Sequence, residues 1–208
     1  MKTKILYATT LLTLALFTTG HAQTLDKAKL DQFFDRLGEK NKAMGSLTIA
    51  KDGNVVYTRA IGYAQVDATT KKPLTAASRF RIASITKTYT AVMILQLVEE
   101  AKLKLTDTLD KFFPQVPNAQ KITILQLLSH RSGIPNVRHD QATWKPGEPV
   151  TKDEMLALIV KGTPEFEPDT KSSYSNSGYF LLGLILEKLT GKPYGQALEE
   201  RINSKIGL

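Results

Sequence analysis

The stretch SITKTYTAVMILQLV, residues 84–98, decides the fold and carries the first candidate chemistry. In its second half, from Ala91 to Val98, seven of eight residues are apolar. A helix that is hydrophobic on every side is normally buried on every side. The sequence therefore predicts a helix from about Ser84 to Leu103 whose apolar half is enclosed by other elements.

The rest of the chain predicts too little sheet to enclose such a helix. Leu47 and Ile49 alternate with polar neighbours, Asp52-Gly53 is a tight-turn signal, and an apolar-rich run returns from Val55 to Ile61. This pattern predicts one β-hairpin, and a lone two-stranded hairpin is only marginally stable in water. Either a partner supplies further strands, or the chain is part of a longer protein.

Helices dominate the other predictions, because apolar residues recur at helical spacing between capping and turn signals. Residues 151–154 fit a capping box. Two loops are long enough to be functional. The predicted elements are a helix from Leu25 to Asn41, a polar connection from Asp67 to Ser78, a helical turn from Thr106 to Pro114, a helix from Thr123 to Ser129 with a stop at Gly133, a loop from Pro135 to Pro149, a helix from Thr151, a loop from Pro164 to Ser177, a helix from Gly178 to Leu189 and a last helix from Pro193 nearly to Leu208.

Composition excludes several classes of protein and site. The chain has 208 residues, 42% of them hydrophobic and 23% charged, which is typical of a soluble globular domain. It contains no cysteine, which excludes disulfides, cysteine-ligated zinc, iron–sulfur clusters and thiol nucleophiles. The net charge of +8 is scattered, and Lys71-Lys72 is the only adjacent basic pair in the sequence, so we expect no nucleic-acid partner.

The amino-terminal segment has the pattern of a secretory signal peptide. Lys2 and Lys4 precede an uncharged, mostly apolar run from Ile5 to Phe17, and small and polar residues follow. The run is shorter than the ~20 residues that span a bilayer, which disfavours an uncleaved membrane anchor. We expect residues 1–22 to be a signal peptide and residues 23–208 to form the mature domain without a stable membrane span. The protein is then periplasmic or secreted from a bacterium.

Ser84 and Lys87 form an S-x-x-K pair at the start of the predicted helix. Residues three apart lie on one helical face. A cation in the first turn opposes the helix dipole, which favours the neutral, proton-accepting form of the amine. A serine hydroxyl becomes a good nucleophile when an adjacent base takes its proton, and the helix amino end stabilises developing negative charge. The bare pattern also fits an ordinary N-cap serine followed by a solvent-facing lysine.

Tyr174 and Asn176 form a second candidate element, Y-x-N, in a polar loop before an apolar helix. A phenol near Lys87 would have its ionised form favoured and could serve as a base or proton shuttle. An asparagine amide both donates and accepts hydrogen bonds, so it can hold a substrate amide and the lysine together. A packed tyrosine and a turn asparagine fit the same letters.

The histidines do not indicate another catalytic class. The chain has no G-x-S-x-G elbow and no H-E-x-x-H spacing, so a Ser-His-Asp hydrolase and a zinc site are disfavoured. We expect His130 to be a structural histidine and His139, beside Asp140, to be exposed.

Taken together, Ser84-x-x-Lys87 and Tyr174-x-Asn176 resemble the serine β-lactamase and penicillin-binding protein superfamily. The likeness is strongest to the branch of class C β-lactamases, D-alanyl-D-alanine carboxypeptidases and related esterases. Residues 127–135, LLSHRSGIP, resemble its LLSHTSGLP segment, and residues 174–194 resemble YSNxGYxLLGxIIExxTGxPY. The resemblance implies an α+β, β-lactamase/transpeptidase-like fold, with a helical region and an antiparallel sheet whose later strands are missing from this chain.

The resemblance also implies an activity, that of an exported serine hydrolase working through an acyl-enzyme. Ser84 would attack the carbonyl of a β-lactam, a D-Ala-D-Ala peptide or a small ester. Lys87 and Tyr174 would manage the protons, and Asn176 would orient this small-molecule or peptidoglycan-derived substrate. No metal or organic cofactor is implied.

The third motif of that family, K-[TS]-G or H-x-G on a later strand, is missing. Lys205-Ile206-Gly207 is only a superficial match, because it falls at the end of a helical segment soon after Asn176. Two alternatives therefore stay open: a penicillin-recognising or cell-wall-binding protein without turnover, and an inactive truncated remnant. The sequence also leaves open the choice among the three substrates and the oligomeric state.

Overall fold

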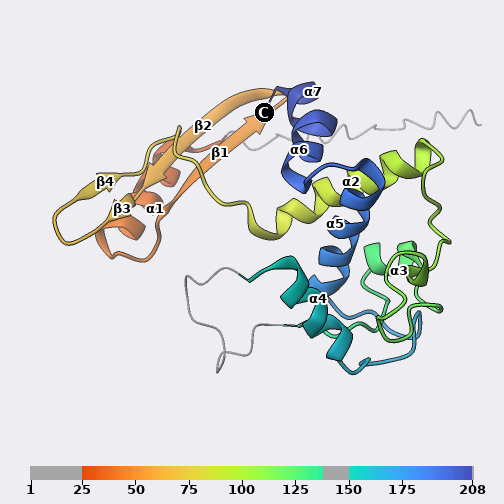
Figure 1. Cartoon of the computed structure of the whole chain (residues 1–208). Coiled ribbons are helices and arrows are strands. Elements are labelled where there is room, and N and C mark those ends of the chain that lie inside the picture. Colours follow the sequence, from red (N-terminus) through yellow and green to blue (C-terminus); the bar gives the residue numbers. More distant parts are fainter. Residues whose placement is uncertain (1–24, 138–149, 208) are drawn as a thin grey trace, which may run out of the picture. The chain divides into compact units, whose positions relative to one another are not determined.

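The computed structural model describes residues 25–137 and 150–207 (Figure 1). The predicted signal peptide and His139 lie outside these residues. The chain divides into two compact units, one up to Phe80 and one from Arg81 onward. None of the described helices is long and apolar enough to cross a membrane.

The first unit contains the predicted hairpin. Strands β1 (Gly45–Lys51) and β2 (Asn54–Ile61) pair antiparallel, and the register shifts between Ile49 and Ala50. The connecting residues Asp52 and Gly53 have φ angles of 51° and 77°. Positive φ at both central residues is characteristic of a type I′ turn, in which Asp-Gly is a preferred pair. The hairpin predicted from the alternation and the turn signal is confirmed.

Helix α1 (Lys27–Glu39) packs against β2 through charged and aromatic side chains. Arg59 forms ion pairs with Asp31, at 2.7 Å, and with Asp35. Tyr57 donates a hydrogen bond to the same Asp31 carboxylate at 2.8 Å. These contacts join the helix to the strand, and the helix lies within the predicted range.

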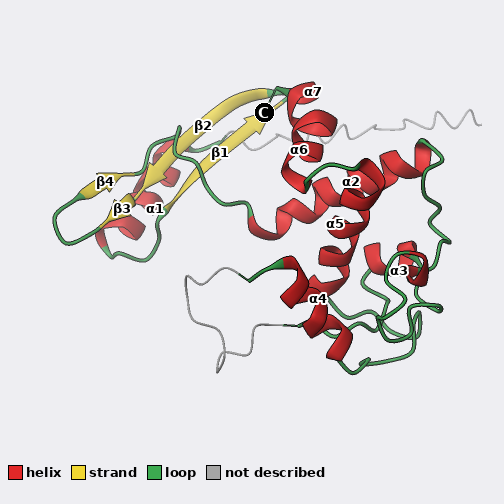
Figure 2. Ribbon diagram, in the orientation of Figure 1, coloured by secondary structure: helices red, strands yellow, loops and turns green. Residues whose placement is uncertain are grey.

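The predicted polar connection from Asp67 to Ser78 is wrong in part, because the chain forms a second hairpin there. Strands β3 (Tyr63–Val66) and β4 (Lys71–Pro73) pair antiparallel (Figure 2). The Asp67 carboxylate stabilises the turn by accepting hydrogen bonds from the backbone N–H groups of Thr69 and Thr70, at 3.0 and 2.8 Å. Every residue of both strands is exposed. They therefore lack the buried alternation by which a strand is recognised in a sequence.

The second unit is built around two helices, α2 (Thr86–Glu99) and α5 (Asn176–Thr190), that pack against each other. Helix α2 follows a 3-10 turn, Ala83–Ile85, and ends earlier than predicted, while α5 begins two residues before the predicted Gly178. Large side chains from both helices are fully buried. They are Met93, Ile94 and Leu97 from α2 and Leu181, Leu182, Ile185 and Leu186 from α5.

Within the described residues α2 is not enclosed on every side, as expected from a sequence that encodes too little sheet to cover it. Val92 and Leu95 are 41% and 48% exposed. The helix has its main described contacts with α5, the preceding 3-10 turn and the π-helical turn Glu199–Asn203, which together cover one face. The apolar run therefore has one buried face and one exposed face.

Two further helices begin with capping boxes. Thr151 caps α4 (Lys152–Lys161) with Glu154, as predicted, and Thr123 caps α3 (Ile124–Leu128) in the same way with Gln126. In each pair the side chains bond reciprocally to the backbone N–H groups that a helix start leaves unpaired. Helix α3 with its two cap residues spans Thr123 to Ser129, as predicted, but the left-handed residue that follows it is His130 and not the predicted stop Gly133.

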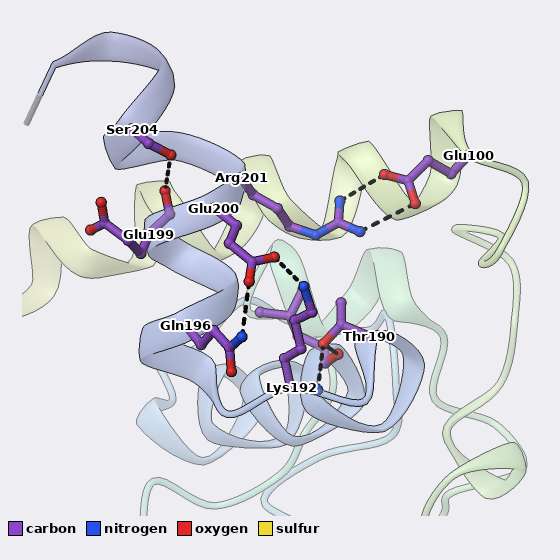
Figure 3. A network of polar contacts seen from close by, with 9 residues as sticks. Glu100, Thr190, Lys192, Gln196, Glu199, Glu200, Arg201 and Ser204 are labelled. Atoms are coloured by element: carbon purple, nitrogen blue, oxygen red, sulfur yellow. Dashed lines mark hydrogen bonds and ion pairs between the residues drawn. The ribbon is translucent and has the colours of Figure 1, made fainter.

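The carboxy-terminal segment is not the single helix predicted from Pro193. It comprises α6 (Tyr194–Leu198), the π-helical turn and α7 (Ser204–Ile206). Figure 3 shows how this segment is joined to α2, since Arg201 donates to both oxygens of Glu100 at 2.7 and 3.2 Å. Lys205-Ile206-Gly207 lies in α7 and its cap, so this K-x-G sequence is helical and not part of a strand.

Candidate active site

Ser84 lies in the 3-10 turn that leads into α2, and its side chain is exposed. The N-cap residue of α2 is Ile85, so the structure does not support the alternative that Ser84 is an ordinary N-cap. Ala83, directly before it, has a φ of 46°. That left-handed conformation costs a residue with a Cβ roughly 1–2 kcal/mol, and such strain is concentrated at functional sites.

The structure brings the four candidate residues together. The Tyr174 hydroxyl donates a hydrogen bond to Ser84 Oγ at 2.9 Å, although the two residues are 90 positions apart. Lys87 Nζ donates to Asn176 Oδ1 at 2.8 Å and lies 4.9 Å from the centroid of the Tyr174 ring. The hydroxyl, amine, phenol and amide thus form one contiguous polar cluster.

Lys87 acts directly on the phenol of Tyr174. Hydrogen bonding with the Lys87 ammonium lowers the pKa of Tyr174 below the ordinary value of 10.0, and the hydrogen bond with Ser84 and the charge of Lys87 act in the same direction. A second tyrosine, Tyr179 on α5, has its ring centroid 5.6 Å from the same ammonium, but burial raises the pKa of its phenol. Tyr174 is therefore the phenol that can ionise more readily.

A groove of about 460 Å³ runs from this cluster between α2 and α5. Ser84, Lys87 and Asn176 line its polar end, and the α5 residues Phe180 and Leu184 contribute to an apolar wall. Pockets that hold small ligands typically have volumes of roughly 300–1,000 Å³ and combine apolar walls with a few polar groups. The groove can therefore accept a substrate chain beside the serine.

Several residues that support the cluster were not predicted from the sequence. The side chain of Asn136 accepts the backbone N–H of Asn176 at 3.0 Å. Ser177 Oγ donates to the Pro135 carbonyl at 2.7 Å and accepts the Val137 N–H at 3.0 Å. These bonds join the loop after α3 to the first turn of α5. In the sequence, these supporting residues were marked only by their place in or next to residues 127–135 and 174–194, the two segments that resemble those of the family.

His130 lies next to the cluster, in contact with the rings of Tyr174 and Tyr179. Its ring centroid is 4.6 Å from that of Tyr174 and 5.1 Å from that of Tyr179. Burial lowers the pKa of the imidazole below 6.5, and the positive charge of Lys87 lowers it further. The second histidine considered, His139, lies outside the described residues.

Comparison with known proteins identifies the relatives of this chain. The profile of the family described as Beta-lactamase matches residues 30–208. Penicillin-binding protein 4* of Bacillus subtilis is 33% identical over 182 residues, which are 86% of this chain and 40% of that protein. D-alanyl-D-alanine-carboxypeptidase/endopeptidase AmpH of Escherichia coli is 28% identical over 219 residues, covering 100% of this chain and 56% of AmpH.

A solved structure agrees with these relatives. D-amino acid amidase from Ochrobactrum anthropi superposes with a TM-score of 0.72 and 28% identity, over 86% of this chain and 50% of the amidase. The chain thus spans about half the length of the relatives it matches. The α+β, β-lactamase/transpeptidase-like fold implied by the sequence is confirmed by the family match and the superposition. The chain belongs to the Beta-lactamase family, within the superfamily of serine β-lactamases and penicillin-binding transpeptidases.

Proposed function

We propose that this protein is an exported serine hydrolase that forms an acyl-enzyme with a D-Ala-D-Ala peptide, a β-lactam or a small ester. The observation that carries the proposal is the 2.9 Å hydrogen bond between the Tyr174 hydroxyl and Ser84 Oγ, with the Lys87 ammonium beside the Tyr174 ring. This arrangement pairs a candidate nucleophile with a candidate base, and the base has an ionised form favoured by a neighbouring cation.

In the proposed acylation, Ser84 Oγ attacks the carbonyl carbon of the substrate. The Tyr174 phenol donates to Ser84 in the resting arrangement, so it first has to release its proton to solvent, and the Lys87 ammonium favours the resulting phenolate. The phenolate then takes the serine proton as the new C–O bond forms. That proton passes to the leaving amine or alkoxide as the scissile bond breaks. Water then attacks the ester, releases the acid and restores the Ser84 hydroxyl.

Asn176 has two proposed roles in the same step. Its side-chain oxygen holds the Lys87 ammonium at 2.8 Å, and its amide nitrogen remains a donor for a substrate carbonyl. Its backbone N–H is bonded to Asn136, which fixes the residue at the start of α5. We therefore assign Asn176 to substrate orientation, and Ser84, Lys87 and Tyr174 to catalysis.

The names of the relatives support the substrate class. AmpH is a D-alanyl-D-alanine-carboxypeptidase/endopeptidase, and the amidase acts on D-amino acid amides. We propose a small-molecule or peptidoglycan-derived substrate, and a periplasmic or secreted location on the basis of the signal-like residues 1–22.

Labelling with a fluorescent penicillin tests the proposal. We expect the label on Ser84, located by peptide mass spectrometry, and no labelling of Ser84→Ala. Ser46→Ala is the matched control, because Ser46 is an exposed serine on β1 of the first unit and should not affect labelling.

The fate of the label separates the alternatives. Rapid release supports a hydrolase, whereas a stable adduct on Ser84 supports a penicillin-recognising protein without turnover. The absence of any Ser84-dependent adduct with the penicillin and with a p-nitrophenyl ester would refute acyl transfer and leave an inactive remnant.

A further inference from the structure

We propose that His130 is a positioning residue that holds the Tyr174 hydroxyl at Ser84. This inference rests on the proposed role of Tyr174 in acyl transfer. It extends the prediction of a structural histidine, because it gives His130 a specific effect on the phenol.

His130 binds the chain on both sides of Tyr174. Its backbone carbonyl accepts the N–H of Ser173 at 2.9 Å, and its side-chain Nδ1 accepts the N–H of Ser175 at 3.2 Å. Tyr174 is the one residue between these two donors. The loop can therefore not carry the phenol away from Ser84 without breaking at least one bond to His130.

The imidazole ring also limits the positions open to the phenol ring. Its centroid lies 4.6 Å from that of the Tyr174 ring and 5.1 Å from that of the Tyr179 ring. Tyr179 is itself held, since its hydroxyl donates to the Leu128 carbonyl at 3.0 Å. The Tyr174 ring therefore contacts His130, which in turn contacts Tyr179, and both of these side chains are held by hydrogen bonds to the backbone.

The backbone conformation of His130 indicates that the side chain matters at this position. Helix α3 ends in a Schellman arrangement, in which the His130 N–H bonds to Leu127 and the Arg131 N–H bonds to Gln126. His130 occupies the left-handed position of that motif, with a φ of 59°. Glycine is the usual residue there because it has no Cβ. A histidine is the more costly choice, and its contacts with Ser175 and Tyr174 give a reason for it.

The hydrogen bond from Ser175 requires an unprotonated Nδ1, so the arrangement depends on a neutral imidazole. The titratable groups facing the ring are Lys87 from α2, Tyr174 from the loop and Tyr179 from α5. Burial and Lys87 both lower the pKa of His130, which keeps it neutral at neutral pH. In acid, protonation would remove the Nδ1 acceptor and break the bond to Ser175, while the bond from Ser173 to the His130 carbonyl would remain.

Two substitutions separate the effect of the His130 side chain from that of its strained backbone, and a third assigns the NMR signal. His130→Gly removes the acceptor and the ring but suits the left-handed conformation, so it isolates the effect of the side chain. His130→Asn also tolerates that conformation and retains a side-chain carbonyl that can accept the Ser175 N–H. Tyr174→Phe identifies the Tyr174 signal in the spectra of protein labelled with ¹³Cζ-tyrosine.

The first readout is the phenol pKa of Tyr174 from NMR titration, which does not depend on activity. We expect a pKa below 10 in the wild type, a shift toward 10 in His130→Gly, and a value near the wild type in His130→Asn. The second readout is the rate constant for Ser84 acylation by the fluorescent penicillin. A misplacement of about 1 Å typically costs about 10²-fold, so we expect a loss of that order in His130→Gly, unchanged initial binding and partial recovery in His130→Asn.

An unchanged Tyr174 pKa and acylation rate in His130→Gly would overturn the inference. If that variant does not fold, His130→Asn decides the question through its pH profile. It should lack the acid-side inflection due to His130, and retention of this inflection would contradict the proposal. If Ser84 is not acylated even in the wild type, the proposed function fails, and the NMR titration still shows whether His130 holds the phenol.

Discussion

Replacement of Tyr174 by phenylalanine removes one hydroxyl and leaves the rest of the site in place. The phenyl ring can keep its contacts with His130, at 4.6 Å, and with the Lys87 ammonium, at 4.9 Å. The substitution removes the hydrogen bond to Ser84 at 2.9 Å and the polar contact of the phenol oxygen with the Lys87 ammonium. Any change in acylation therefore reports on the proton-transfer role of the phenol and not on packing.

The expected magnitude follows from that role. General acid–base catalysis by a positioned side chain contributes typically 10²–10⁴-fold, so the acylation rate constant should fall at least about 10²-fold. This corresponds to about 2.7 kcal/mol of activation free energy. Tyr174 is 49% exposed, and a substitution at such a surface position should change the free energy of unfolding by less than about 0.5 kcal/mol.

Stopped-flow labelling with a fluorescent penicillin across a pH series measures this effect. In the wild type the rate constant should rise with pH as Tyr174 ionises, and the midpoint of this rise should lie below pH 10 because Lys87 lowers the phenol pKa. Tyr174→Phe should lack that rise. Tyr63→Phe is the matched control, since Tyr63 is a similarly exposed tyrosine in the first unit. Acylation of Tyr174→Phe within about threefold of the wild type, with the same pH profile, would refute the reasoning.

Three further predictions concern stability, each measured by urea unfolding. Gly133→Ala should lower the free energy of unfolding by more than about 2 kcal/mol, because Gly133 has a φ of 72° and an added Cβ would lie 2.0 Å from the Phe166 carbonyl oxygen. An unchanged free energy of unfolding would show that this loop can adapt to the extra atom. Leu182→Ala should cost about 2–5 kcal/mol, because the side chain is fully buried, and a smaller loss would mean that the core collapses around the cavity. Hydrogen bonds from Arg201 and, next, from Lys102 lower the pKa of Glu100 from 4.5 to about 2, so the stability due to these contacts is present above pH 4.5 and is lost as the pH falls toward 2. Arg201→Met should reduce that pH dependence at a cost below about 1 kcal/mol, since the pair is partly exposed, and an unchanged profile would show that Lys102 or other carboxylates cause it.

Features that depend on neighbouring residues were predicted well from the sequence. The Asp52-Gly53 turn and its hairpin follow from alternation and from the conformations that these two residues tolerate. The capping box at Thr151 follows from the reciprocal bonds between residues three apart. In both cases the determining interactions lie within one turn of chain, so no knowledge of the packing is needed.

Features that depend on packing were predicted less well. The strands β3 and β4 are short and exposed, so they carry no hydrophobic period, although they pair. The predicted span of α3, from Thr123 to Ser129, is correct, but its stop was assigned to Gly133, whereas the left-handed residue that ends it is His130. Side-chain contacts with Tyr174 and Ser175 compensate for the strain there, and those contacts come from a distant part of the chain.

The candidate site combines both kinds of information. The sequence alone determined that Ser84 and Lys87 lie one turn apart at the start of an apolar helix, because helical geometry sets the positions of residues so close in the chain. Only the tertiary structure decided that the Tyr174 hydroxyl contacts Ser84 and that His130 binds the chain on both sides of this tyrosine. The reason is physical: a contact between residues 90 positions apart depends on how α2 and α5 pack and on the loop bonds that support them.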